Sequence, residues 1–376
     1  MRSIIAGKLI VTAERRGRYI LDHEIEVPMI DIREMSIEEL EGLVKELGEP
    51  KFRAKQIFEW LHKHNVSDYG KMTNLSKSLR SKLAEAYPLS EAEQVLVESS
   101  GDGTRKYVLE LEDSTTVETV GMPVSFDEKG NRIKRLTVCF SSQAGCPMEC
   151  SFCATGREGF VRNLTASEMV NQVLVVQEDF ATPVSNVVAM GQGEPFLNYD
   201  NLLGALRRIN TDPGLNIGAR KITVSTCGII EGIEKFGKEP EQFRLAVSLH
   251  SARQRTRDQL MPKLASQPLD YLQQALIEYN YESGRRVTLE YMLIAGVNDS
   301  DAEMDALAVF CEGINCHVNI IPFNPVEQLD LKASGRSIVQ RWVKGLSSVG
   351  IPGSVRNSRG GDIHGACGQL KEVNAC

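Results

Sequence analysis

Residues 135–153 read RLTVCFSSQAGCPMECSFC, a short β-branched segment that runs directly into a loop with three cysteines. Cys146, Cys150 and Cys153 follow the spacing CxxxCxxC, which supplies one thiolate fewer than a closed tetrahedral zinc or iron–sulfur site uses. Three protein ligands leave one metal position open. This stretch therefore predicts a metal site at the end of a strand, with room for a small molecule on the metal.

A zinc knuckle is the alternative reading of the same loop. It would need a fourth ligand at a short spacing, but His250 lies far downstream and Cys227 has no CxxC partner. Cys227, Cys311, Cys316 and Cys376 are expected to be small buried hydrophobic side chains. The spacing thus favours the open metal site over the zinc knuckle.

Segments of the same kind recur after the cysteine loop and alternate with helix-like segments. Counting residues 135–140, they give six βα units. Such repeats predict a parallel sheet covered by helices, with the active site at the carboxyl ends of the strands. Six units are too few for a closed eight-fold barrel, so we predict an α/β fold with a partial (β/α)6 barrel. The other expected strands are 185–190, 221–226, 243–249, 286–293 and 317–322, and the expected helices include 167–180, 201–209, 269–279 and 301–312.

Two different residue patterns precede the barrel, the first typical of helices and the second of strands. Ser36 and Glu39 form a capping-box pattern that opens a helical domain, and β-branched runs separated by turn-like segments, DEKGN at 127–131 among them, follow from about residue 95. We predict an N-terminal extension (1–35), a helical accessory domain (36–92), a β extension (93–133), the barrel (134–350) and a mobile C-terminal segment (351–376). Capping boxes are also expected at Thr165 and Ser300, and an apolar stripe in the accessory domain at Phe52, Ile57, Trp60 and Leu61.

The charge distribution and the cysteine content indicate which partners and which cellular compartment to expect. The formal net charge of -7 gives no overall basic signature, but residues 51–90 carry eight Lys or Arg against three Asp or Glu. This local excess predicts either RNA contact or a solvated helix face. Nine cysteines without a secretory leader or a membrane-length apolar run predict a cytoplasmic protein with reduced thiols and no membrane partner.

Several motifs in order carry a resemblance to known enzymes. The CxxxCxxC loop after the first barrel strand resembles the signature of the radical S-adenosylmethionine superfamily. SSQAGCPMECSFCATG, GFVRNLTASE, MGQGEP, VSTCG, SLH, IPFNP and GACGQL together resemble the RlmN/Cfr family, which methylates an aromatic carbon of adenine in RNA. The resemblance extends from about Ser36 to Leu370.

The resemblance implies a cofactor site at the strand ends. It implies a [4Fe-4S] cluster on Cys146, Cys150 and Cys153 whose open iron binds S-adenosylmethionine, two molecules of which are used per methylation. The residues implied to bind S-adenosylmethionine are Gly193, Glu194, Ser225, Ser248, Leu249, His250 and Asn324. Each of these residues, taken singly, also has an ordinary structural explanation, such as capping a turn.

Two further cysteines are implied to act in catalysis. In this family the cysteine that matches Cys367 accepts a methyl group, a radical formed on that group adds to adenine, and the cysteine that matches Cys139 releases the product by forming a disulfide. Glu118 matches the family's proposed base, although a surface carboxylate on a strand explains it equally well. From the residues alone, Cys139 would be an ordinary buried cysteine.

The substrates implied are adenine C2 in 23S ribosomal RNA near the peptidyl-transferase centre and in tRNA beside the anticodon. An enzyme of this kind needs a low-potential electron donor such as flavodoxin or ferredoxin, and we expect a monomer. Two alternatives remain open: methylation at C8 of the ribosomal adenine, linked to antibiotic resistance, and a non-catalytic, metal-stabilised RNA-binding protein. Basic residues near the cluster loop and the C-terminal segment are expected to contact phosphates or to be solvated: Lys134, Arg135, Arg157, Arg162, Arg356 and Arg359.

Overall fold

The computed structural model describes the chain except residues 1, 6–7, 16–17, 27–30, 88, 90–91, 127–132, 327–328 and 372–376, and for 2–26 and 125–126 it describes the backbone alone. The expected turn at 127–131 and Cys376 lie outside the described residues. The chain forms two compact units, the first comprising residues 1–91 with the loop 211–216 and the second the remainder. Each unit is described by itself below.

The first unit combines a small sheet with a helical core. Strands β1 (Arg2–Ile5), β2 (Lys8–Arg15) and β3 (Arg18–Glu26) form an antiparallel sheet within the predicted extension, where no periodicity in the sequence had indicated strands. Three helices follow, and their apolar faces pack on one another around Ile57, Leu61 and Leu79. They are α1 (Ile37–Glu46), α2 (Phe52–His62) and α3 (Lys77–Ala86), with the 3-10 turns η1 (Ile32–Glu34) and η2 (Tyr69–Lys71).

The predicted stripe of α2 is partly wrong. Ile57 and Leu61 are buried as expected and Trp60 is half-buried, but Phe52 is 57% exposed. Phe58 is buried in its place, because the face that packs on the core runs through residues 54, 57, 58 and 61 of the helix. Phe52, at the first turn, instead lies under the Arg53 guanidinium, 4.9 Å from its ring centre.

The second unit is built on one ten-stranded sheet, ordered β15-β14-β13-β12-β11-β10-β7-β6-β5-β4. The six predicted barrel strands are present and parallel, which confirms the partial barrel. A seventh parallel strand, β15 (Gly353–Val355), pairs with β14 inside the segment that we predicted to be mobile. The six are β7 (Ile133–Phe140), β10 (Val184–Ala189), β11 (Ile222–Thr226), β12 (Arg244–Ser248), β13 (Val287–Leu293) and β14 (Cys316–Pro322).

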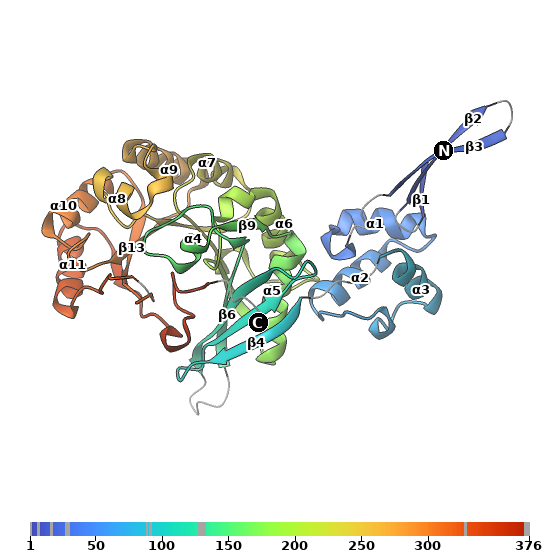
Figure 1. The fold of residues 1–376 in the computed structure, drawn as a ribbon, viewed down its shortest axis with the longest axis horizontal. Coiled ribbons are helices and arrows are strands. Elements are labelled where there is room, and N and C mark those ends of the chain that lie inside the picture. Colours follow the sequence, from blue (N-terminus) through green and yellow to red (C-terminus); the bar gives the residue numbers. More distant parts are fainter. Residues whose placement is uncertain are drawn as a thin grey trace. The chain divides into compact units, whose positions relative to one another are not determined.

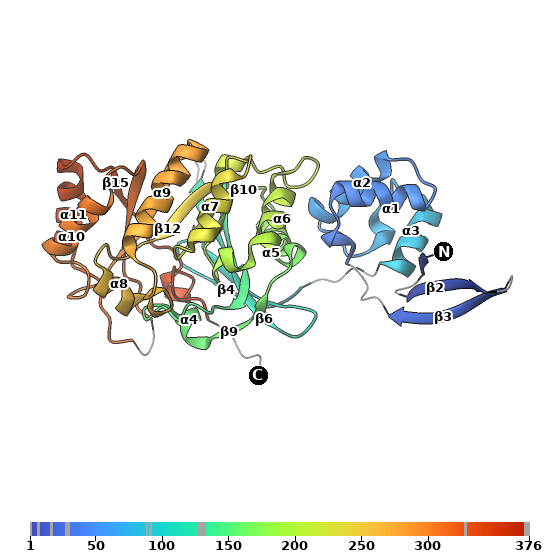
Figure 2. The ribbon, with the colours of Figure 1, turned by 90° about the horizontal axis from the view of Figure 1, so that it is seen from above.

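Helices line the outer side of the curved barrel sheet, as Figures 1 and 2 show. This leaves the carboxyl ends of the strands and their loops open at one end, as a parallel βα repeat requires. These outer helices are α5 (Ala166–Asp179), α6 (Tyr199–Asn210), α7 (Ile230–Lys238), α9 (Leu269–Ser283), α10 (Asp301–Phe310) and α11 (Arg336–Ser348). The short helices α4 (Ala154–Glu158) and α8 (Gln254–Leu260) lie instead in the loops that follow β8 and β12.

The β segment before the barrel continues the same sheet. Strands β4 (Glu93–Ser99), β5 (Arg105–Glu110) and β6 (Thr116–Phe126) are antiparallel, and β6 pairs with β7 so that Val120 lies opposite Cys139. A separate hairpin joins β8 (Gln143–Gly145) to β9 (Phe160–Asn163) around the cysteine loop. The first barrel strand is therefore flanked by sheet on both sides.

Two of the three expected capping boxes are complete. Both Ser36 with Glu39 and Thr165 with Glu168 show the reciprocal hydrogen bonds. At Ser300 the prediction is only half right: its hydroxyl accepts from the Glu303 amide, but the Glu303 carboxylate accepts from the Ser251 and Thr256 hydroxyls. Those hydroxyls tie α10 to the end of β12 and to α8.

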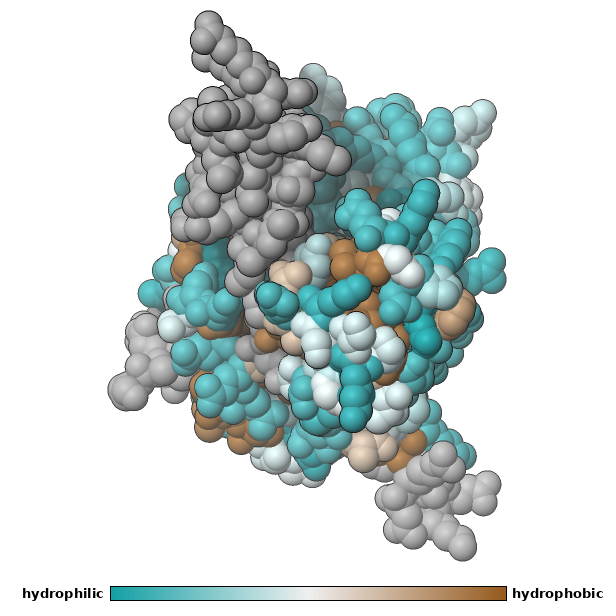
Figure 3. Space-filling model, turned by 90° about the vertical axis from the view of Figure 1, so that its right-hand side faces the viewer, coloured by the Kyte–Doolittle hydropathy of each residue, from teal (hydrophilic) through white to brown (hydrophobic). Residues whose placement is uncertain are grey.

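Among the described residues, no helix combines the length and apolar character needed to cross a bilayer. The face shown in Figure 3 is largely hydrophilic, with apolar side chains in small separate areas.

Candidate active site

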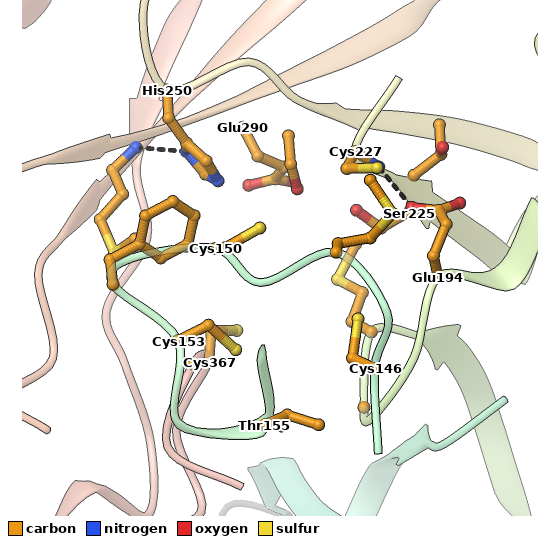
Figure 4. Close-up of a pocket in the computed structure, with 18 of the residues that line it drawn as sticks. Cys146, Cys150, Cys153, Thr155, Glu194, Ser225, Cys227, His250, Glu290 and Cys367 are labelled. Atoms are coloured by element: carbon orange, nitrogen blue, oxygen red, sulfur yellow. Dashed lines mark hydrogen bonds between the residues drawn. The ribbon is translucent and has the colours of Figure 1, made fainter. Parts of the chain in front are cut away.

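A cavity opens at the carboxyl ends of the barrel strands and contains about 970 Å³ of space, part of it open to solvent. Its walls come from the cysteine loop, the ends of β10 to β14 and the C-terminal segment (Figure 4). This is where a parallel βα barrel is expected to bind its ligands. The polar and sulfur-containing side chains that line it include Cys146, Cys150, Cys153, Thr155, Glu194, Ser225, Cys227, Ser248, His250, Glu290, Arg356 and Cys367.

The three motif cysteines all face this cavity. The loop between β8 and α4 carries them, and Gly145 at its start has a φ of +68° and would place a Cβ atom 2.1 Å from the Gly159 carbonyl oxygen. Only glycine fits that approach. The loop is held further by the Ser151 amide, which donates to the carbonyl of Leu260, and the Ala154 amide, which donates to that of Gly368.

The arrangement of these thiols suits a cluster better than a single ion. In the described part of the chain, no three His, Cys, Asp or Glu side chains are grouped closely enough to hold one metal ion. Figure 4 shows the three cysteines distributed around the cavity, as a cluster with a thiolate at each of three corners requires. Burial raises the pKa of all three thiols, that of Cys146 to about 12. Metal ligation requires the deprotonated thiolates, so binding of a cluster would release their protons.

His250 is held as a neutral ring at the cavity wall. Its Nδ1 accepts from the Met292 amide at 3.1 Å, which places the ring proton on Nε2. Burial, with a smaller effect of Arg257, lowers the pKa of His250 to about 3. The rings of His250 and Phe152 pack edge to face, with 4.8 Å between their centres. The imidazole can therefore serve as a hydrogen-bond donor without charge.

The GQGEP loop serves a structural need as well as the expected ligand contact. Gly193 has a φ of +101°, and a Cβ there would come within 2.6 Å of the Gln143 side chain. Glu194 is buried and accepts from the amides of Phe196 and Cys227 at 3.0 and 2.7 Å. Burial raises the pKa of Glu194 while these donors lower it. Its carboxyl group lines the cavity at the predicted place.

The remaining predicted cofactor residues divide into two groups. Ser225 and Ser248 line the cavity, whereas Leu249 and Asn324 are not among its lining residues. The Leu249 side chain is fully buried, and its amide donates to the Glu290 carbonyl. The Asn324 amide group donates to the Cys367 carbonyl at 3.0 Å, so it positions the C-terminal segment.

Cys367 lies between this cavity and a second one. The second cavity, of about 770 Å³, is lined by Cys139 and Cys367 together with Met122, Met190 and Arg356. Figure 4 shows Cys367 beside Cys153 on the other side. Cys139 is buried in β7, and burial raises the pKa of its thiol to about 12. The structure thus brings both predicted catalytic cysteines to one junction.

Hydrogen bonds from several loops hold the C-terminal segment around Cys367. The Thr155 hydroxyl donates to the Leu370 carbonyl at 2.6 Å, and the Gln369 side chain donates to the Pro325 carbonyl at 2.7 Å. At the other end, Asp102 accepts from the Gly360 amide at 3.3 Å. The segment that the sequence suggested would swing over the barrel is anchored here across the cavity.

Glu118 lies in β6 and lines neither cavity. Its Oε1 is 3.0 Å from the Lys106 ammonium group, which also pairs with Glu98 at 2.7 Å. Its Oε2 accepts from the Lys371 amide at 2.7 Å. Burial raises the pKa of Glu118, and Lys106 opposes that shift. The predicted base is thus a buried carboxylate linked to the segment that carries Cys367.

Several residues that line the first cavity had no predicted role there, among them Thr155, Cys227 and Glu290. Glu290 points into the first cavity from β13 and accepts from Asn319 at 2.7 Å; a carboxylate within the apolar run RVTLEYML was the available signal. Arg356, expected near phosphate, instead lines both cavities, with Cys367, Glu290 and Cys139 as electrostatic neighbours. Arg162 is also committed elsewhere, to ion pairs with Asp113 and Glu168.

Comparisons with known proteins agree with this geometry. Residues 30–88 match a family model described as the ribosomal RNA large subunit methyltransferase N-terminal domain, and residues 140–308 match the radical SAM superfamily. A probable dual-specificity RNA methyltransferase RlmN from Nostoc punctiforme is 44% identical over 89% of this chain and 92% of its own. One of the same description from Clostridium perfringens is 40% identical over 91% and 97%.

A solved structure supports the same assignment. A radical SAM methyltransferase from Sphaerobacter thermophilus superposes with a TM-score of 0.84 at 42% identity, covering 91% of this chain and 99% of that one. Both units and nearly the whole length of these relatives are therefore represented. The chain belongs to the RlmN family of radical S-adenosylmethionine enzymes.

Proposed function

We propose that this enzyme methylates C2 of adenine in 23S ribosomal RNA and in tRNA beside the anticodon, through a methyl group carried on Cys367. The observation that carries the proposal is the junction of the two cavities, where Cys367 faces the motif cysteines on one side and shares a wall with Cys139 on the other. The relatives from Nostoc punctiforme and Clostridium perfringens are named probable dual-specificity RNA methyltransferases, which supports RNA of two kinds as the substrate.

The residues of the first cavity fit the implied cofactors. Cys146, Cys150 and Cys153 would hold a [4Fe-4S] cluster, and the polar groups of Glu194, Ser225, Ser248 and His250 would bind S-adenosylmethionine. Adenine C2 is an electron-poor ring carbon that polar methyl transfer does not reach, and the cluster supplies the single electron that opens radical chemistry. Two molecules of S-adenosylmethionine per product follow from this scheme, one for the methyl group and one for the radical.

The protein's own thiols perform the group transfer. The Cys367 sulfur takes a methyl group by displacement. A hydrogen atom is removed from that group, the resulting carbon radical bonds to adenine C2, and the ring proton of C2 is lost to a base. Cys139 attacks the Cys367 sulfur, so that a sulfur–sulfur bond forms as the bond from sulfur to the transferred carbon breaks; the freed carbon takes up a proton to become the product's methyl group, and the unpaired electron would return to the cluster. Arg356, which lines the second cavity with both cysteines, favours the thiolate form of the attacking group. A thiol reductant must restore both cysteines afterwards.

The second cavity suits the base that is modified. Met122, Met190 and Cys139 form an apolar wall beside Cys367, and such a wall can receive a base that has left its stack. The enzyme would therefore act on loops or unpaired nucleotides. A low-potential donor such as flavodoxin or ferredoxin would supply electrons, and the protein would act in the cytoplasm as a monomer.

Product analysis tests this function directly. Anaerobically reconstituted protein, given ribosomal RNA or tRNA fragments, S-adenosylmethionine and a reductant, is expected to yield 2-methyladenosine by mass analysis of digested RNA. Cys150→Ser should abolish product and bound sulfide together, because it removes a cluster ligand. Formation of 8-methyladenosine instead would assign the C8 activity, and wild-type protein with zinc and no acid-labile sulfide would indicate the non-catalytic RNA-binding protein.

The helical unit is proposed to grip RNA away from the reacting base. A groove there is lined by Lys77, Arg80 and Ser81, and Lys77 and Lys71 are exposed. Replacing Lys71 and Lys77 by alanine is expected to weaken RNA binding. The plot of log association constant against log salt concentration should become less steep by about 1.5, because two phosphate contacts are lost. Filter binding at several salt concentrations measures both. Lys51→Ala, which removes an exposed lysine already paired with Glu41, is the control and should change neither.

A further inference from the structure

A buried cation lies under the first cavity without an ion-pair partner in the described part of the chain. Arg257, in α8, is 2% exposed. Its guanidinium group donates to the carbonyl oxygens of Ser248, Leu249 and Cys227 at 3.0, 2.5 and 2.6 Å, and approaches the Met261 sulfur at 3.3 Å. These partners satisfy its hydrogen bonds but not its charge, and a buried charge without a counter-charge is costly.

The carboxyl groups nearby are engaged elsewhere. Glu194 accepts from two amides, Glu290 from Asn319, and Asp258, the residue after Arg257, from Gln254. Three residues that the Arg257 guanidinium contacts, Cys227, Ser248 and Met261, line the cavity together with Cys150. Cys150 is one of the three proposed cluster ligands. The charge of Arg257 is therefore directed toward the place where the cluster would lie.

We propose that Arg257 is the counter-charge of the iron–sulfur cluster and raises its reduction potential. The inference rests on the proposed function, since it requires the cluster on Cys146, Cys150 and Cys153. A [4Fe-4S] core of charge +2 on three thiolates has a net charge of about -1, and taking up one electron makes it about -2. A fixed cation nearby stabilises the reduced cluster more than the oxidised one. Arg257 would thereby ease electron transfer from the donor.

The carbonyl contacts give Arg257 a second, purely structural role that has to be separated from its charge. They hold the residue that follows β11, two positions after Ser225, to the end of β12 at Ser248. Arg257 does not line the cavity, so it is a positioning residue. Losing the positive charge and losing the N–H donors of the guanidinium group have different consequences. Two substitutions of Arg257 distinguish them.

The chain supplies a matched control in Arg285. It is 8% exposed and donates to the carbonyl oxygens of Glu241, Phe243, Phe236 and Gly237. It precedes β13, at the amino-terminal end of the barrel strands, whereas the cavity lies at their carboxyl ends. Arg285 thus shares the burial and the carbonyl partners of Arg257 but not the proximity to the cysteines.

The test is the midpoint potential of the full-length, anaerobically reconstituted protein, followed by electron paramagnetic resonance during reductive titration. Arg257→Met is expected to lower the equilibrium constant for one-electron reduction about tenfold, or about 59 mV, the order expected for one charge within about 10 Å of the cluster. Arg257→Lys, which keeps the charge, should stay within about twofold of wild type. Arg285→Met should match wild type.

Each other outcome is decisive. A fully loaded Arg257→Met protein at the wild-type potential would overturn the proposal, as would an equal shift in Arg285→Met. If Arg257→Met fails to retain iron and sulfide while Arg257→Lys is fully loaded, the charge is required and the proposal stands. Equal loss in both Arg257 variants would show that only the carbonyl contacts matter and would overturn it. Wild-type protein without iron and sulfide would instead refute the proposed function itself.

Discussion

Replacing Cys139 by alanine is expected to trap the protein on its RNA. Among the described residues that line the second cavity, Cys139 and Cys367 are the only cysteines, so without the Cys139 sulfur the bond between Cys367 and the transferred carbon is expected to persist. The expected result is a covalent protein–RNA adduct that survives denaturation, with turnover reduced to one event per enzyme or fewer. Denaturing gel electrophoresis with labelled RNA, followed by mass spectrometry of the Cys367 peptide, measures the adduct.

Cys316→Ala is the matched control for this experiment. Cys316 is also a buried cysteine in a barrel strand, 6% exposed against 8% for Cys139, but it opens β14 and lines neither cavity. It should release methylated RNA as wild type does. A Cys139→Ala protein that turns over freely, or that is recovered without RNA while still methylating it, would refute the assignment of Cys139.

Replacing Glu118 by glutamine is expected to lower methylation about a hundredfold or more. A base must remove the ring proton of adenine before the product can leave, and general bases contribute rate factors of about 10² to 10⁴. Burial raises the pKa of Glu118, which makes it a stronger base, and the nearby Lys106 opposes that shift. The proton-transfer step should then become rate-limiting, which single-turnover assays with adenine deuterated at C2 would reveal as an isotope effect.

The position of Glu118 outside both cavities calls for two controls. Its Oε2 accepts from the Lys371 amide, so Glu118 also holds the segment that carries Cys367. Glutamine preserves an acceptor for that amide, whereas Glu118→Leu removes it. Glu98→Gln perturbs Lys106 without touching Glu118, since Glu98 is the other partner of that lysine. If Glu118→Gln is active and Glu118→Leu is not, Glu118 acts as an anchor of the C-terminal segment and not as the base.

The sequence predicted those parts of the fold that local patterns determine. Apolar, β-branched runs predicted all six barrel strands, because strands buried in a parallel sheet need such side chains. β15, three residues long, has no pattern of its own and exists only because β14 is there to pair with it. In the helical unit, Phe58 is buried and the predicted Phe52 is not. The buried face of α2 is rotated from the predicted one, and periodicity in the sequence determines that face only to within about one residue.

Those residues of the candidate site that belong to recognisable sequence motifs could be predicted. The cysteine spacing alone indicated an open metal site, whereas Cys139 in an apolar strand could be recognised only by resemblance. Glu290, Arg257 and Arg356 come from separate elements, and their relation to the cysteines depends on how loops far apart in sequence meet. Asn324 shows the converse: the residue is close to the site, but its side chain holds the backbone of Cys367.

The anchoring of the C-terminal segment has a consequence for how the protein is made. The amide of Ala154, next to Cys153, is satisfied by Gly368, and the Thr155 hydroxyl by Leu370, 215 residues away. A chain still emerging from the ribosome can form most of its strands and helices, but these donors have no partner until residues 368–370 have left the ribosome. The wall of the cavity beside Cys153 is therefore among the last of the described parts to be completed.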